Sequence, residues 1–150
     1  SDPVNYQFEL SEPDTAATLK KSLMEMSFPR GCRKSRLLAF LATRSDNREV
    51  IGLVYLTLEP DHLRATLGVK IHHPWQGMGF GGEAVGAVSD FAFRTLRVHR
   101  LAAACDARNT ACVRLFESLG FRREGELKDC VYHRERGWVD CLMFAKLAGE

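Results

Sequence analysis

Apolar and polar residues alternate over residues 4–10, and this period of two predicts a half-buried strand near the start of the chain. Ser11 then offers a helix cap, and apolar residues recur at helical spacing as far as about Ser27. Pro29 cannot continue a helix, so the predicted helix ends before it. The basic residues that follow, 30–36, predict a loop.

Two apolar runs rich in β-formers, residues 37–43 and 49–58, flank the turn-forming residues 44–48. This arrangement predicts an antiparallel hairpin. A third strand is expected over residues 63–71, where odd-numbered positions are apolar and even-numbered positions are mostly polar. The three strands together predict a meander.

A glycine-rich turn then leads into a helix with an apolar stripe. The stripe consists of Ala84, Val85, Val88, Phe91 and Ala92. A short buried strand is predicted at 101–105, and Asn109 stands where the cap of the next helix belongs. That helix is expected to run to Leu119 and to close with Gly120 in the left-handed conformation.

Two final strands are predicted at 121–133 and 138–147, joined by a turn at 134–137. The full order is strand, helix, meander, helix, strand, helix and closing hairpin. It predicts an α+β domain on a mixed, mostly antiparallel sheet.

Composition fits one ordinary globular domain over residues 1–150, since 45% of the residues are apolar and 27% are charged. The net charge is only +2, which gives no electrostatic footprint for nucleic acid. Arginine outnumbers lysine by 15 to 6, so we expect any bound anion to be held by guanidinium groups.

The five cysteines form no CxxC pair, so neither a disulfide framework nor a zinc site is expected, and we expect no metal. Reduced thiols favour the cytoplasm. We expect no membrane partner, because no apolar run approaches the ~20 residues of a membrane span. The first residues also lack a signal-peptide pattern.

The segment that indicates chemistry is Gln76-Gly-Met-Gly-Phe-Gly-Gly82, between a strand and a helix. Glycines there allow a close approach of the backbone, and N–H groups at a helix start attract phosphate. A P-loop is excluded because no Gly-Lys-Ser/Thr follows. A dinucleotide-binding loop remains a second interpretation, although the acidic residue expected about 20 positions later is absent.

Gln76-x-x-Gly79-x-Gly81 resembles the diphosphate-binding signature of the GNAT (Gcn5-related) N-acetyltransferases. The segment from Asn109 to Phe121 is similar to a second landmark of that family. Glu83-Ala84, Arg123-Glu-Gly125 and Gly137-Trp-x-Asp140 further resemble the ribosomal-protein-alanine N-acetyltransferase branch. The resemblance implies the GNAT fold, in which two central parallel strands splay apart between flanking helices, here residues 63–71 and 101–107.

By the same resemblance, the chain is expected to be an enzyme that transfers an acetyl group from acetyl-CoA to a primary amine by direct attack in a ternary complex. The residues implied for acetyl-CoA lie on the third strand, in the glycine loop and on the later helix. They are Val69, Lys70, Ile71, Gln76, Gly77, Met78, Gly79, Phe80, Gly81, Gly82, Asn109 and Arg114. Asn109 can serve as a plain helix cap as well.

The catalytic groups depart from the family pattern. Many members carry a tyrosine acid where this chain has Phe116, and Cys112 is the alternative proton donor, unless it is simply a small buried helix residue. Thr66 replaces the glutamate that this branch often uses as a base. His72 and His73 are the nearest candidate bases, with water as a further route for the proton.

The resemblance places the amine acceptor between the first helix, the loop after it and the last hairpin. This nominates Phe28, Arg30, Tyr132 and Trp138, although Trp138 also fits a core position of the closing strand. The resemblance implies that the acceptor is a small amine or a peptide N-terminus, and it admits a homodimer, since homodimers are common in the family. The missing tyrosine and glutamate also admit a non-catalytic acyl-CoA-binding module of the same fold.

Overall fold

A computed structural model describes residues 36–59 and 63–150 of the chain. The predicted strand 4–10, the helix after it and the basic loop lie outside the described residues. The same holds for Phe28 and Arg30, so these two expectations stay predictions.

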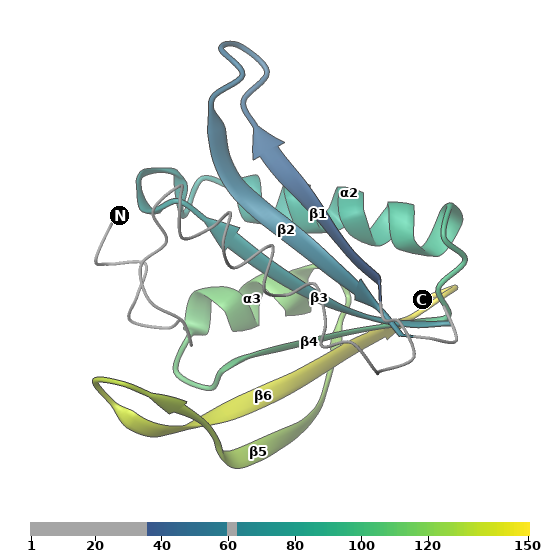
Figure 1. Cartoon of the computed structure of the whole chain (residues 1–150). Coiled ribbons are helices and arrows are strands. Elements are labelled where there is room, and N and C mark those ends of the chain that lie inside the picture. The colour runs from purple at the N-terminus through teal and green to yellow at the C-terminus, as the bar shows by residue number, and fades with distance from the viewer. Residues whose placement is uncertain (1–35, 60–62) are drawn as a thin grey trace.

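A six-stranded mixed sheet forms the centre of the described structure (Figure 1). Its spatial order is β1 (Arg36–Thr43), β2 (Val50–Leu58), β3 (Arg64–Ile71), β4 (Arg100–Asp106), β6 (Gly137–Leu147) and β5 (Arg122–His133). Among the strands that the structure describes, only β3 and β4 pair in parallel, and every other neighbouring pair is antiparallel. The α+β fold predicted from the sequence, with its central parallel pair, is confirmed.

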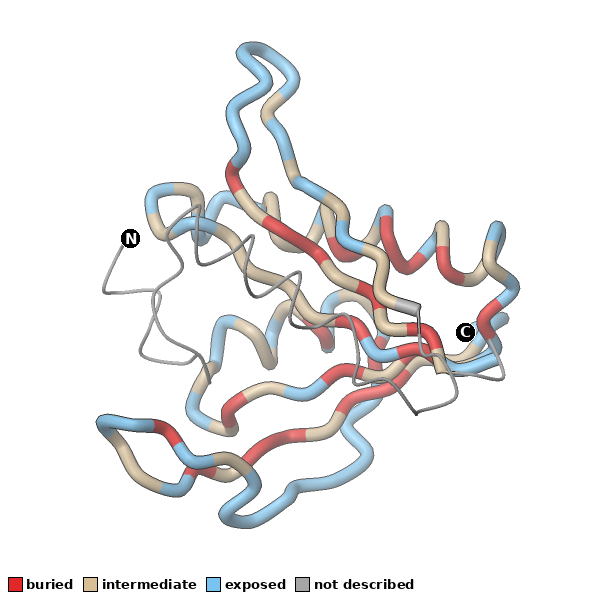
Figure 2. Tube along the Cα trace, in the orientation of Figure 1, coloured by how far each residue is buried: buried red, intermediate tan, exposed pale blue. Residues whose placement is uncertain are grey.

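The two longer helices of the described residues pack against one face of this sheet. The short helix η2 (His73–Trp75) follows β3, and α2 (Phe80–Arg94) begins directly after the glycine loop. The predicted stripe of α2 turns inward, with Val85, Val88 and Ala92 buried (Figure 2). The second helix on this face is α3 (Thr110–Ser118).

The sequence sets both ends of α3 through local hydrogen bonds. Asn109 Oδ1 accepts a hydrogen bond from the backbone N–H of Cys112 at 3.0 Å, so the predicted cap is confirmed. At the other end, Gly120 has a φ of 79°, which glycine adopts without strain. Phe121 N–H then bonds the carbonyl of Phe116 at 3.0 Å and closes the helix.

The core lies between the sheet and these two helices. Its centre on the α3 side is Phe116, which is 1% exposed. The ring of Phe116 contacts Phe121 and Phe144, with centroid distances of 5.3 and 5.5 Å. The core continues along the central strands through Leu56 on β2, Leu67 on β3 and Leu101 on β4. None of these three residues is more than 2% exposed.

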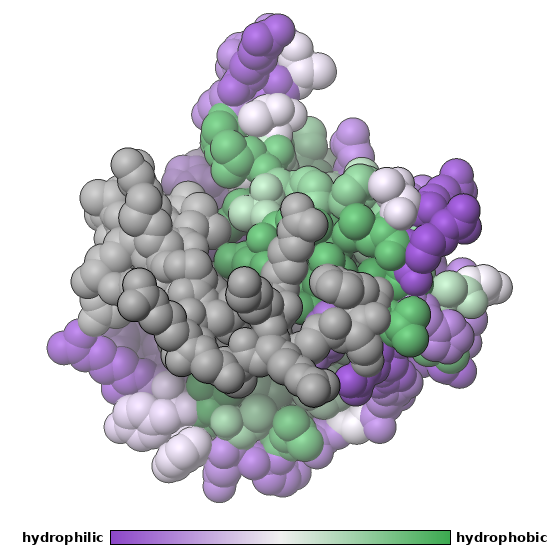
Figure 3. Space-filling view, turned by 45° about the vertical axis from the view of Figure 1, so that its right-hand side comes forward, coloured by the Kyte–Doolittle hydropathy of each residue, from purple (hydrophilic) through white to green (hydrophobic). Residues whose placement is uncertain are grey.

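Two parts of the sheet remain open to solvent. The turn between β1 and β2 projects from the body and is hydrophilic at its tip (Figure 3). At the opposite side, β5 is an edge strand whose residues 122–130 are all exposed. Its pairing with β6 shifts register twice, and Asp129 adopts a φ of 45° within the second irregularity. Across the described residues, no helix is long and apolar enough to cross a membrane.

We predict that Phe116→Ala destabilises the fold by about 3–5 kcal/mol, because it removes a fully buried ring from between two other aromatic rings. Urea unfolding measures the change. Leu41→Ala is the control, since Leu41 is 57% exposed and its truncation should change the free energy of unfolding by less than about 0.5 kcal/mol. Equal losses in the two variants would contradict the assigned core.

Candidate functional site

The parallel strands β3 and β4 separate part-way along their length. Their pairing runs from Arg64 opposite Arg100 to Leu67 opposite Ala103, and then stops. β3 nevertheless continues to Ile71 and β4 to Asp106. A gap therefore opens between the two strands at their carboxyl ends, where the sequence predicted that a parallel pair splays apart.

The glycine loop follows the open end of β3. Gly77 and Gly79 have φ values of 75° and 89°, a region that residues with side chains rarely adopt. A Cβ at either position would meet no atom within 4 Å, so the loop presents bare backbone to open space. The Gln76 side chain anchors the loop to β3, because its Nε2 donates to the carbonyl of Ile71 at 2.8 Å.

Helix α2 starts at the end of this loop, with Gly79 as its N-terminal cap and no side chain capping its first turn. The first N–H groups of a helix have no partner within the helix, and its dipole favours negative charge there. The open glycine backbone and the uncapped helix start together fit a diphosphate.

Helix α3 begins beside the same opening. Gly81 and Gly82 lie close to Leu115 of α3, because a Cβ on either would come within 3.8 Å of its side chain. Asn109 caps α3, and Arg114 is exposed on it. The glycine loop and helix α3 therefore lie close together near the carboxyl end of β3.

Cys112 lies in the first turn of α3 and is half-buried against the core. Its thiol is hydrogen-bonded to that of Cys105, which lies on β4 beyond the last β3–β4 pair. This hydrogen bond and burial raise the pKa of the Cys112 thiol far above its usual value, while the same bond lowers the pKa of Cys105. Cys112 therefore remains a protonated thiol at neutral pH.

The end of β4 is organised by a buried carboxylate that the sequence interpretation missed. The Asp106 side chain is 1% exposed, and its Oδ1 accepts hydrogen bonds from the Arg108 backbone N–H at 2.9 Å and Arg108 Nε at 3.3 Å. Its Oδ2 accepts from Arg136 Nη1 at 2.8 Å. One residue thus joins the loop before α3 to the turn between β5 and β6.

Opposing effects act on this carboxyl group. Burial alone would raise the pKa of Asp106, but the hydrogen bonds from Arg108 and Arg136 and the positive charge of Arg108 outweigh burial. The pKa of Asp106 therefore lies below its usual value. The ionised form is the one that the folded protein stabilises.

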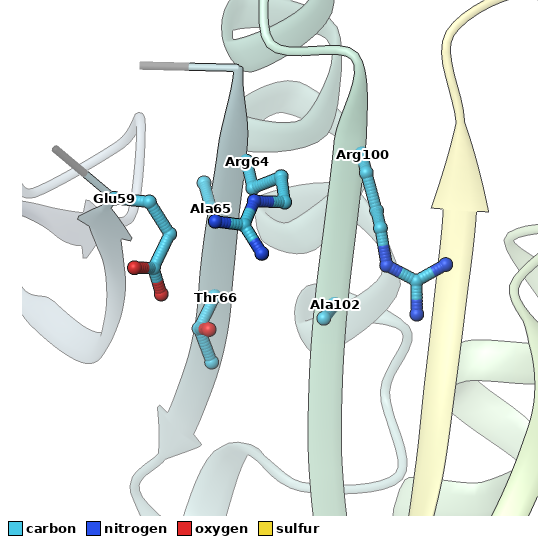
Figure 4. A pocket seen from close by; sticks show the side chains of 6 residues that line it. All are labelled: Glu59, Arg64, Ala65, Thr66, Arg100 and Ala102. Carbon is cyan, nitrogen blue, oxygen red and sulfur yellow. The ribbon is translucent and has the colours of Figure 1, made fainter. Parts of the chain in front are cut away.

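The candidate bases lie beyond the segment in which β3 and β4 are paired. His72 and His73 follow the end of β3, next to the glycine loop. Thr66 lies in the paired segment and lines a cavity of about 120 Å³ near the amino-terminal ends of β3 and β4 (Figure 4). Glu59, Arg64 and Arg100 also line this cavity, and Arg100 extends toward β6 in Figure 4. Its guanidinium forms a bidentate ion pair with Glu124 on β5.

The structure corrects the core interpretation of Trp138. This side chain is 61% exposed and lies edge-on to Tyr132, which is 58% exposed, with ring centroids 5.6 Å apart. The two residues face each other across the β5–β6 hairpin next to its turn, so the indole anchors the hairpin end rather than the core. They form an exposed aromatic pair. Among the described residues, no group of three or more potential ligands could hold a metal ion.

We predict that Asp106→Asn lowers the free energy of unfolding by about 2 kcal/mol at pH 7, because it removes the charge from a buried hydrogen-bonded carboxylate. Since the folded-state pKa is depressed, this stabilisation is present above the unfolded pKa of about 3.9 and disappears as pH falls through the folded value. Urea unfolding at pH 7 and at decreasing pH down to 3 measures it.

The difference between wild type and Asp106→Asn should therefore shrink below about pH 4. Asp90→Asn, at an exposed position of α2, is the matched control and should change stability by less than about 0.5 kcal/mol. A difference that stays constant with pH would contradict the role given to the Asp106 charge.

Comparisons with known proteins agree with this geometry. A family model described as an acetyltransferase (GNAT) domain matches residues 1–122. The chain is 34% identical over 104 residues to the N-acetyltransferase p20 of Bacillus licheniformis, covering 68% of this chain and 57% of that protein. It is 33% identical over 86 residues to the ribosomal protein uS5-alanine N-acetyltransferase of Escherichia coli, covering 56% and 44%. The chain thus spans about half the length of these curated relatives.

Among solved structures, a spermidine N-acetyltransferase from Vibrio cholerae in complex with CoA and spermine is similar in fold. The match has a TM-score of 0.77 at 21% identity, and it covers 97% of this chain and 86% of that one. The family match over most of the sequence, the splayed parallel pair and the glycine loop at a helix start lead to one conclusion: this chain belongs to the GNAT acetyltransferase family.

Proposed function

We propose that this chain is an acetyl-CoA-dependent N-acetyltransferase that passes the acetyl group directly to a primary amine. The observation that carries the proposal is the end of the β3–β4 pairing beside an uncapped, glycine-lined helix start. A gap between strands can admit the extended pantetheine arm, and the helix start can hold the diphosphate. Relatives named as N-acetyltransferases support the same activity.

In this proposal acetyl-CoA, the acetyl donor, lies along the open end of the gap. The backbone of Val69, Lys70 and Ile71 pairs with the pantetheine arm, and an N–H of this strand donates to the thioester oxygen as negative charge develops. Asn109 and Arg114 hold the remainder of CoA from α3. The phosphates contact Gln76, Gly77, Met78, Gly79, Phe80, Gly81 and Gly82.

The proton transfers are assigned to groups near the gap. Cys112 is a protonated thiol in the first turn of α3, so we assign it as the group that donates a proton to the departing thiolate. His72 or His73 can receive the proton that the amine releases, either directly or through water. An α-amine needs little help in this step, because its unperturbed pKa is only about 7.7–8.0.

The exposed aromatic pair supports an acceptor-binding role for the β5–β6 hairpin. Tyr132 and Trp138 offer a large apolar surface with polar tips. Relatives and neighbours include an enzyme named for a ribosomal-protein alanine and one in complex with spermine. We therefore propose a peptide N-terminus or a small amine as the acceptor. Phe28 and Arg30, outside the described residues, are proposed to complete this site.

Phe116 is the observation that favours a second candidate, a non-catalytic acyl-CoA-binding module. The family's tyrosine acid is replaced by a phenyl ring that is 1% exposed and fully committed to the core. This module would bind CoA without turnover. Consumption of acetyl-CoA with any member of an amine panel excludes it.

We predict that CoA and acetyl-CoA stabilise the protein against thermal unfolding, by about 2.7 kcal/mol at 100 times the dissociation constant. Gly79→Ala should abolish most of this shift, because the new methyl group would occupy the open side of the loop. Gly149→Ala is the matched control: it has a φ of 97° and equally open surroundings, but lies near the C-terminus. Stabilisation by NAD or ATP alone would overturn the cofactor assignment.

We further predict that Cys112→Ala lowers kcat by about 100-fold, the usual scale of a lost general acid, with little change in the KM for acetyl-CoA. Steady-state kinetics with the best amine of the panel measure both constants. Cys141→Ala is the control, because Cys141 is a buried thiol on β6 outside the proposed machinery. Full turnover in Cys112→Ala would remove this residue from the mechanism.

A further inference from the structure

A tyrosine on β2 lies over a glycine on β3. Tyr55 and Gly68 are directly opposite each other in the antiparallel register of these strands. A Cβ built on Gly68 would lie 2.0 Å from Tyr55 Cζ and 2.2 Å from its hydroxyl oxygen. The hydroxyl end of Tyr55 therefore fills the space that a side chain at position 68 would need. Only glycine at that position admits the ring.

This contact occurs where the β3–β4 gap begins. Leu67 is the last β3 residue paired with β4, so Gly68 is the first residue at which the two strands are apart. Tyr55 reaches Gly68 from the β2 side, and its phenol oxygen is the most distant atom of the side chain. The hydroxyl group therefore lies over Gly68, at the position on β3 where the gap begins.

The Tyr55 side chain lies on the face of the sheet opposite helices α2 and α3. Val54 and Leu56, the neighbours of Tyr55 on β2, belong to the core beneath α2, so Tyr55 projects from the opposite face. The glycine loop and Asn109 belong to the starts of α2 and α3, on the helical side. If acetyl-CoA is held by the starts of these helices, the amine can approach the gap from the opposite face of the sheet.

We propose, resting on the function proposed above, that Tyr55 is a catalytic residue whose phenol oxygen accepts a hydrogen bond from the attacking amine. The nitrogen lone pair is then directed at the thioester carbon. In the transfer the N–C bond forms and the C–S bond breaks. The nitrogen loses a proton to a base or water, the thiolate gains one, and the phenol keeps its own. The hydrogen bond strengthens as positive charge develops on nitrogen.

Tyr55→Phe tests the hydroxyl while retaining the ring over Gly68. We expect kcat/KM for the amine to fall by about 10- to 100-fold, the range for one hydrogen bond to a charged group. The KM for acetyl-CoA and the CoA-induced melting shift should be unchanged. Spermidine and a peptide beginning with alanine are the amines used.

Two further variants separate this role from a structural one. Thr57→Val removes a hydroxyl from the same strand and the same face, two residues further along, and should leave both constants unchanged. Gly68→Ala displaces the ring, so it should lower kcat/KM for the amine as Tyr55→Phe does. The double variant should then lose no more than either single one, because both remove the same contact.

The outcomes distinguish this inference from the function on which it rests. If wild type binds CoA and acetylates an amine while Tyr55→Phe retains full kcat/KM, the role of Tyr55 is overturned and the function stands. Additive losses in the double variant also overturn it. If wild type binds CoA but acetylates neither amine, both the proposed activity and the role of Tyr55 fail.

Discussion

Parallel pairing between β3 and β4 lasts for four residue pairs and ends at Leu67 and Ala103. Strands that stay in one sheet while their backbones separate leave peptide groups that require other partners. A molecule that can offer such partners along an extended backbone is therefore favoured in the gap. The features around the site depend on this separation, since without it the glycine loop would border a closed sheet.

The two sides of the opening are held by different means. On the β3 side, Gln76 binds the carbonyl of Ile71 and fixes the start of the glycine loop. On the β4 side, Asp106 joins the α3 cap loop to the β5–β6 turn through Arg108 and Arg136. The Gln76 anchor is local in sequence, whereas the Asp106 anchor joins segments 30 residues apart.

The sequence predicted elements whose signals are local. Asn109 and Gly120 mark the ends of α3 because a cap and a left-handed glycine act within one turn. The glycine loop was found for the same reason. Asp106, the Cys105 thiol beside Cys112 and Tyr55 over Gly68 were missed, because each depends on cross-strand register or on the fold of distant segments. The alternative core position for Trp138 was wrong, because apolar alternation along a strand does not show where a hairpin extends beyond the helices that cover the sheet.

The irregular edge strand β5 has a consequence for the behaviour of the protein at high concentration. A long, flat edge invites another chain to add a strand, which is a common beginning of aggregation. Here the edge is bent by two register shifts, and Lys128 is held by Glu126 and Asp140 beside Asp129. A new strand could not follow this outline without breaking those ion pairs. The irregular outline and the charged side chains therefore disfavour the addition of a further strand at this edge.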